Sequence, residues 1–153
     1  CFQTITSSED QDILAELKDL NLVPIMLQLL VAISAPENET SADTPGLLGS
    51  ILTTLTNLSL NDANSVKLRL HGAHIVGKLL MDNCPALNKD VPKVYVPGSP
   101  GDNLKVMHEL QMHCLRCLRF LYSVEKNRKA FKMIFPPSLF GAFIDVGNYN
   151  KDF

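Results

Sequence analysis

Cys114 and Cys117 are the residues of this sequence whose type and spacing most directly suggest chemistry. Thiolates in a Cys-x-x-Cys pattern can give two ligands to one zinc ion or act as a redox pair. His108 and His113 lie nearby, but no second ligand pair with matching spacing follows. The cysteines also sit in a leucine-rich stretch, where a three-residue spacing puts two small apolar side chains on one helix face. We predict that both pack in the core and that no metal is bound, with a zinc or redox site as the alternative.

A cluster of basic residues with aromatic residues among them is the second chemically distinctive feature. Its members are Arg116, Arg119, Lys126, Arg128, Lys129 and Lys132. Such clusters can bind nucleic acid or an acidic partner. Because the net charge of the chain is −2, we favour a solvated helix face beside core aromatics and expect no nucleic-acid partner. Docking of this surface against a neighbouring domain is a further interpretation, and the first five basic residues are candidate partner-binding residues.

Catalytic residues are not predicted anywhere in this chain. Serine, histidine and aspartate are present without a nucleophile elbow or a comparable motif. We therefore expect neither hydrolase chemistry nor a bound cofactor.

Length and composition fit one helical domain in a reducing compartment. A chain of 153 residues can bury about 68–70% of its unfolded surface without metals or disulfides. Four cysteines are too few for a disulfide framework in a chain this long, which predicts an intracellular, cytoplasmic location. Apolar runs stay shorter than the roughly 18 residues of a membrane span, so no membrane contact is expected. The chain begins with Cys1 rather than Met, and we expect it to be a piece of a longer protein.

Hydrophobic periodicity divides the chain into helices and two exposed loops. Apolar residues at helical spacing predict helices over 9–20, 22–34, 47–60 and 103–122, and shorter ones over 130–135 and 139–146. Between residues 66 and 80 we predict two helices, with Gly72 taking a left-handed conformation that ends the first. A turn is expected over 124–127. Proline-rich and polar composition predicts exposed loops over 35–45 and 83–102.

The two halves of the chain align with each other, which is typical of a helical repeat protein. Leu55-Thr56-Asn57-Leu58-Ser59, followed by Asn64 and Leu68, matches Leu118-Arg119-Phe120-Leu121-Tyr122, followed by Asn127 and Phe131. We predict a repeat domain over 8–149 with units 8–60, 61–123 and 124–149.

The segments 55–64 and 72–80 resemble an armadillo unit, and 117–128 and 134–147 resemble the armadillo region of the NIMA-related serine/threonine kinases. This resemblance implies a right-handed α-solenoid of about two and a half repeats. It also implies a regulatory and protein-interaction segment just before a kinase domain, with that kinase domain as a possible partner. The chain has no glycine-rich loop, His-Arg-Asp or Asp-Phe-Gly motif, so ATP and magnesium would belong only to the kinase domain of the parent.

In armadillo proteins an asparagine ladder on the third helices holds an extended peptide, and the resemblance places Asn57 at a ladder position. Phe120 replaces the next asparagine, while Thr53 and Arg116 stand where tryptophans would be. One amide cannot fix a long peptide, and Asn57 can instead have a structural role at the helix end. A stand-alone adaptor that binds an extended peptide is therefore the alternative function.

Overall fold

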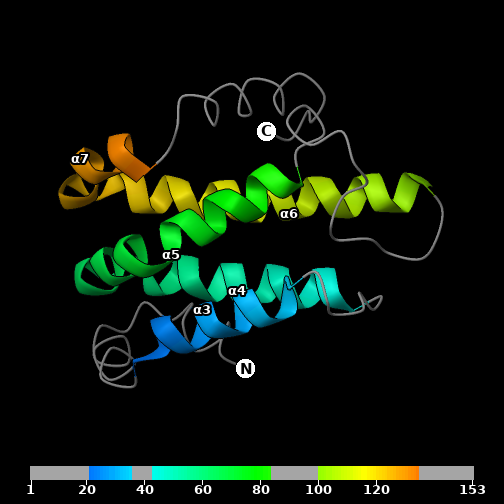
Figure 1. Ribbon diagram of the computed structural model, residues 1–153, viewed down its shortest axis with the longest axis horizontal. Coiled ribbons are helices and arrows are strands. Elements are labelled where there is room, and N and C mark those ends of the chain that lie inside the picture. Colours follow the sequence, from blue (N-terminus) through cyan, green and yellow to red (C-terminus); the bar gives the residue numbers. More distant parts are fainter. Residues whose placement is uncertain (1–20, 36–42, 84–99, 135–153) are drawn as a thin grey trace.

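The computed structural model describes residues 21–35, 43–83 and 100–134, which form five α-helices and no strand (Figure 1). The helices are α3 (Leu22–Ile33), α4 (Thr44–Leu58), α5 (Asp62–Asp82), α6 (Pro100–Ser123) and α7 (Glu125–Ile134). The predicted all-α class is confirmed. The helices expected over 9–20 and 139–146, and the loop residues 36–42 and 84–99, lie outside the described residues.

The helices pack in two layers. Helix α4 lies beside α6 in one layer, and α3 lies beside α5 in the other, so that α3 covers α4 and α5 covers α6 (Figure 1). Helix α7 packs against both α5 and α6. Among the described residues, none of the helices is both long enough and apolar enough to cross a membrane.

Aliphatic side chains of α3, α4, α5 and α6 fill the space between the layers, and α7 adds Phe131. Leu30, Leu48, Leu52, Leu55 and Leu121 are fully buried. Each buried leucine of this kind contributes about 1.5–3 kcal/mol relative to an exposed one. The periodicity of three and four in the sequence identified these positions, because it marks the helix face that turns towards the core.

Helix α5 corrects the predicted pair of short helices, since it runs without a break through Gly72. No glycine among the described residues has a positive φ. A Cβ atom at position 72 would lie 2.5 Å from Leu27 Cδ2 and 2.8 Å from Leu68 Cδ1. Gly72 is therefore needed for the close approach of α3 to α5, and a left-handed helix end is not its role.

Both predicted loops are shorter than expected where the structure describes them. Helix α4 begins at Thr44, with Pro45 in its first turn, and α6 begins at Pro100. Proline is tolerated in the first turn because the backbone N–H groups there have no partner within the helix. The expected turn over 124–127 is also shorter, since only Val124 separates α6 from α7.

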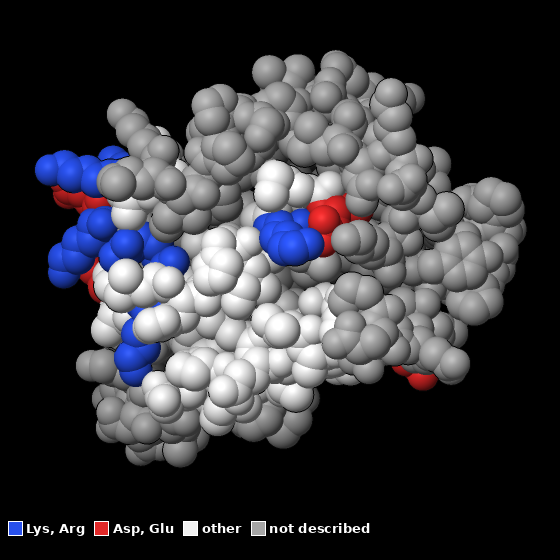
Figure 2. All heavy atoms as spheres, in the orientation of Figure 1, with Lys and Arg blue, Asp and Glu red and all other residues white. Residues whose placement is uncertain are grey.

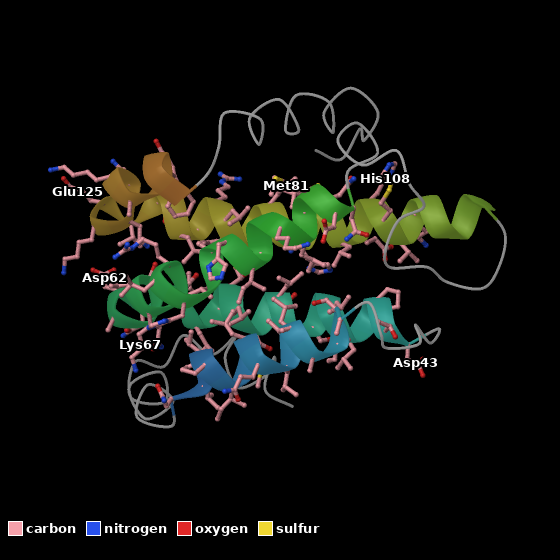
Figure 3. All side chains as sticks on the ribbon, viewed as in Figure 1. Asp43, Asp62, Lys67, Met81, His108 and Glu125 are labelled. Carbon is pink, nitrogen blue, oxygen red and sulfur yellow. The ribbon has the colours of Figure 1, made fainter. Side chains whose placement is uncertain are left out.

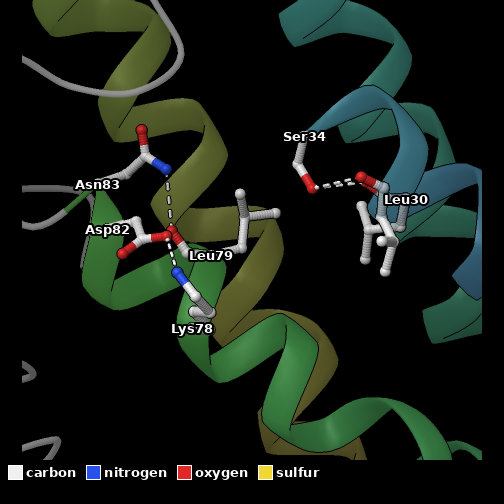
Figure 4. Close-up of polar contacts among 7 residues, drawn as sticks. Leu30, Ser34, Lys78, Leu79, Asp82 and Asn83 are labelled. Atoms are coloured by element: carbon white, nitrogen blue, oxygen red, sulfur yellow. Dashed lines mark hydrogen bonds and ion pairs between the residues drawn. The ribbon is translucent and has the colours of Figure 1, made fainter. Parts of the chain in front are cut away.

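Side chains satisfy several of the free backbone groups at helix ends. Asn61 precedes α5, and its Oδ1 accepts from the backbone N–H of Ala63 at 3.0 Å. At the other end of α5, Asn83 Nδ2 donates to the Leu79 carbonyl at 2.9 Å (Figure 4). The hydroxyl of Ser34 donates to the Leu30 carbonyl at 2.7 Å after the last turn of α3. These side-chain contacts add hydrogen bonds to the backbone at the ends of α3 and α5.

Candidate interaction surfaces

A hollow of about 200 Å³ opens between the N-terminal half of α4 and the middle of α6. Helix α4 contributes Gly46, Gly49 and Thr53 to its wall, and α6 contributes Glu109 and His113. The small residues of α4 follow one another at intervals of three and four, which places them on one face of the helix. The hollow forms between this face and α6 because the small side chains of α4 fill little of the space.

His113 reaches across to α4 through close contacts with two residues. Its Nδ1 lies 3.3 Å from Thr53 Oγ1, and a Cβ atom on Gly49 would lie 3.1 Å from its Nε2. The Thr53 hydroxyl donates its hydrogen to the Gly49 carbonyl at 2.8 Å. Because a hydroxyl has one hydrogen, the Thr53 oxygen accepts from His113 in the tautomer that carries its proton on Nδ1.

The pKa of His113 is lowered from its usual value, mainly because the half-buried ring loses solvent. The positive charge of Arg116 lowers the pKa further, and the carboxylate of Glu109 raises it in part. His113 is therefore a neutral hydrogen-bonding group at neutral pH. The sequence suggests His113 only as a zinc ligand and does not predict this contact, although the spacing of small residues on α4 is a signal for it.

The residues that the resemblance places along a peptide groove lie on two adjacent helices. Thr53 and half-buried Asn57 belong to α4, and Arg116 and Phe120 belong to α6, which packs beside it. Phe120 is 37% exposed. The amide of Asn57, the ring of Phe120 and the guanidinium of Arg116 therefore belong to the same layer of helices. Partner binding by Asn57 and Arg116 stays a prediction.

Cys114 and Cys117 both lie in the core, as predicted from their spacing. Burial raises the pKa of the Cys117 thiol to about 12, although a hydrogen bond with Thr56 lowers it in part. Burial also raises the pKa of Cys114 well above its usual value, and the neighbouring Cys117 adds to this effect. Metal binding requires thiolates, which this environment disfavours. Within the described ranges, three or more potential ligands from histidine, cysteine, aspartate and glutamate do not gather at any point.

Asn127, at the start of α7, connects three helices through its side chain. Its Nδ2 donates to Ser65 Oγ on α5 at 2.9 Å and to the Leu121 carbonyl on α6 at 2.9 Å. Its Oδ1 accepts from Arg69 Nε on α5 at 3.0 Å. The internal repeat had aligned Asn127 with Asn64 without assigning either a role. Both are buried, and the structure assigns Asn127 the role of linking α7 to α5 and α6.

The predicted basic cluster is exposed but spreads over two helices. Arg116 and Arg119 are exposed on α6, and Lys126, Arg128 and Lys129 are exposed on α7. The side chain of Lys132 lies outside the described residues. Helix α5 adds the half-buried Lys67 and Arg69, which the sequence does not link to the cluster because they lie far away along the chain. Blue side chains accordingly gather where α5, α6 and α7 meet (Figure 2).

Three protein kinases are similar to this chain. Serine/threonine-protein kinase Nek10 of mouse is 30% identical over 144 residues, and Nek10 of human is 32% identical over 144 residues. Both alignments cover 94% of this chain. A serine/threonine-protein kinase of Caenorhabditis elegans is 29% identical over 126 residues, or 80% of the chain. No protein-family model and no solved structure matches.

The chain spans 12% of the mouse kinase and 11% of the human kinase. It is homologous to one segment of these proteins, which confirms the resemblance to the NIMA-related kinases and specifically to the tenth member. The sequence contains none of the kinase motifs, and phosphoryl transfer depends on them. The matching segment is therefore a non-catalytic part of these kinases.

Proposed function

We propose that this homologue of a Nek10 segment is an armadillo-type scaffold that regulates a NIMA-related serine/threonine kinase through protein interactions. The layered packing of the helices supports this proposal. Helices α4 and α6 carry the matching sequence segments and lie side by side, and α3 and α5 lie side by side in the other layer. Stacked helix pairs of this kind form extended recognition surfaces in solenoid proteins.

In this proposal the segment contributes surface and position, and another domain of the parent phosphorylates proteins with ATP and magnesium. The segment would hold that kinase domain or recruit its partners from the cytoplasm. Free thiols at Cys114 and Cys117 are in keeping with a reducing compartment. One feature departs from an armadillo unit: the continuous helix α5 replaces the short first helix, glycine corner and second helix.

The direct test measures whether this chain binds the isolated catalytic domain of its parent kinase. We expect saturable binding by calorimetry when the two are mixed as separate polypeptides, and a changed phosphorylation rate of a generic protein substrate. Deleting residues 21–134 from the full-length kinase should change the rate in the opposite direction, and adding the separate chain should reverse that change. No binding, together with an unchanged rate after the deletion, would contradict the proposal.

A second candidate function is a stand-alone adaptor that holds an extended peptide along α4 and α6. The hollow beside Thr53 and His113 favours it, since it offers a hydroxyl, a neutral imidazole and free volume. Peptides selected on the chain should lose binding in Gly46→Trp, because nothing lies within 4 Å of a Cβ atom there and the indole can fill the hollow. Kinase motifs encoded downstream of Phe153 in the parent gene would exclude a stand-alone adaptor.

A further inference from the structure

We propose that the end of the molecule where α5, α6 and α7 meet binds an acidic segment of a partner protein. This surface, called the basic end, consists of Lys67 and Arg69 on α5 and Lys126, Arg128 and Lys129 on α7. The inference rests on the proposed scaffold function and names the chemistry of its partner. Its main support is the set of hydrogen bonds that orient Arg69 and Arg128.

Both guanidinium groups of the basic end are oriented by neutral acceptors. Arg69 Nε donates to Asn127 Oδ1 at 3.0 Å. Arg128 donates through Nε to the Tyr122 carbonyl at 3.3 Å and through Nη2 to the Ser123 carbonyl at 3.1 Å. These acceptors fix the side chains without neutralising them. Each guanidinium keeps its full charge and has further N–H groups for a carboxylate or a phosphate.

The lysines of the basic end are also without carboxylate partners among the described residues. Lys67 Nζ donates to the amide oxygen of Asn21 at 3.1 Å. The ion pairs that the described ranges contain are Lys78–Asp82 at 2.6 Å and Lys105–Glu109 at 4.0 Å, and neither belongs to this surface. Within the described ranges, none of the five cations is paired directly with a carboxylate.

Among the residues that the structure describes, two carboxylates lie at this end of the molecule and limit its charge. Figure 3 shows Asp62 and Glu125 at the same end as Lys67. Each stands in the first turn of its helix, where the helix dipole favours a negative charge. The five cations outnumber these two carboxylates, so the described part of this surface is positive. Although the net charge of this chain is −2, this local positive surface attracts an anionic segment of a partner.

A protein segment fits this surface better than nucleic acid does. Nucleic-acid binding depends on neutralising many phosphates along a duplex or strand, and the net negative charge of the chain opposes it. A short run of glutamate, aspartate or phosphorylated residues needs only the few fixed cations found here.

The test uses the whole chain and a fluorescein-labelled peptide in which glutamate alternates with serine. Fluorescence anisotropy should show saturable binding that weakens as ionic strength rises from about 0.05 M to about 0.5 M. The double variant Lys126→Glu/Lys129→Glu should bind about tenfold more weakly, since both positions are exposed and each substitution reverses a charge. The control Lys105→Glu reverses one exposed charge on α6, outside the basic end, and should bind as the natural chain does.

Thermal unfolding of all variants shows whether they fold. Absence of saturable binding at low salt, or an equal loss in Lys105→Glu, would overturn the proposal. Tighter binding of a single-stranded RNA with the same charge and label would overturn it in favour of nucleic acid. If the acidic peptide does not bind, the proposal for the basic end is wrong. Calorimetry with the kinase domain tests the scaffold function independently.

Discussion

The side-chain nitrogen of Asn127 lies 2.9 Å from the hydroxyl of Ser65 and donates a hydrogen bond from α7 to α5. Both residues are fully buried. The same amide holds the Leu121 carbonyl and the Arg69 guanidinium. One side chain therefore fixes how the second predicted unit continues into the third.

Replacing Asn127 with alanine should destabilise the fold by about 2–3 kcal/mol, because it removes several hydrogen bonds and leaves buried polar groups without partners. Urea unfolding followed by circular dichroism measures the change. Ser123→Ala is the control: this exposed hydroxyl makes one hydrogen bond, to the Phe120 carbonyl, and its loss should cost less than about 0.5 kcal/mol. Equal midpoints for Asn127→Ala and the natural chain would show that the network contributes nothing.

Alanine at Gly72 and alanine at Gly46 should change stability in opposite directions. At Gly72 the added methyl meets the buried side chains of Leu27 and Leu68. The overpacking costs about 1–3 kcal/mol and exceeds the gain in helix propensity of about 1 kcal/mol, so the variant should lose roughly 1 kcal/mol. At Gly46 nothing lies within 4 Å of the new methyl, and a gain of up to about 0.5–1 kcal/mol is expected. A stabilised Gly72→Ala would mean that α3 and α5 do not pack this closely.

His113 should make the fold less stable below pH 6.5. Its pKa is lowered in the folded chain relative to the ordinary value of 6.5. As the pH falls through 6.5, the unfolded chain takes up a proton that the folded chain does not, so the free energy of unfolding decreases. The decrease should level off below the folded pKa. Unfolding curves from pH 8 to pH 5 compared with those of His113→Gln isolate this effect, and identical pH profiles would contradict it.

Cys114 and Cys117 should resist thiol reagents in the folded chain. Burial keeps both thiols protonated, and the reactive species is the thiolate. In a Cys1→Ser/Cys84→Ser background, Ellman's reagent at pH 8 should react with these thiols only as fast as the protein opens. In concentrated urea both should react at once. Rapid, stoichiometric reaction without urea would show that the cysteines lie outside the core.

The sequence anticipated most of the helices and much of the core. Regular apolar spacing located α4 and α6 to within a few residues, because a buried helix face repeats every three or four positions. It also placed Cys114 and Cys117 in that face. Homology then confirmed the link to NIMA-related kinases that short local segments had suggested.

The sequence did not decide what each small or polar residue does, since those roles depend on neighbours far away along the chain. Gly72 looked like a helix end until Leu27 was placed against it. Asn127 was one position in a repeat until Ser65 and Arg69 were brought to it. Helical periodicity is local and can be read from the sequence, whereas a close approach or a shared amide exists only after α3, α5 and α7 have packed together.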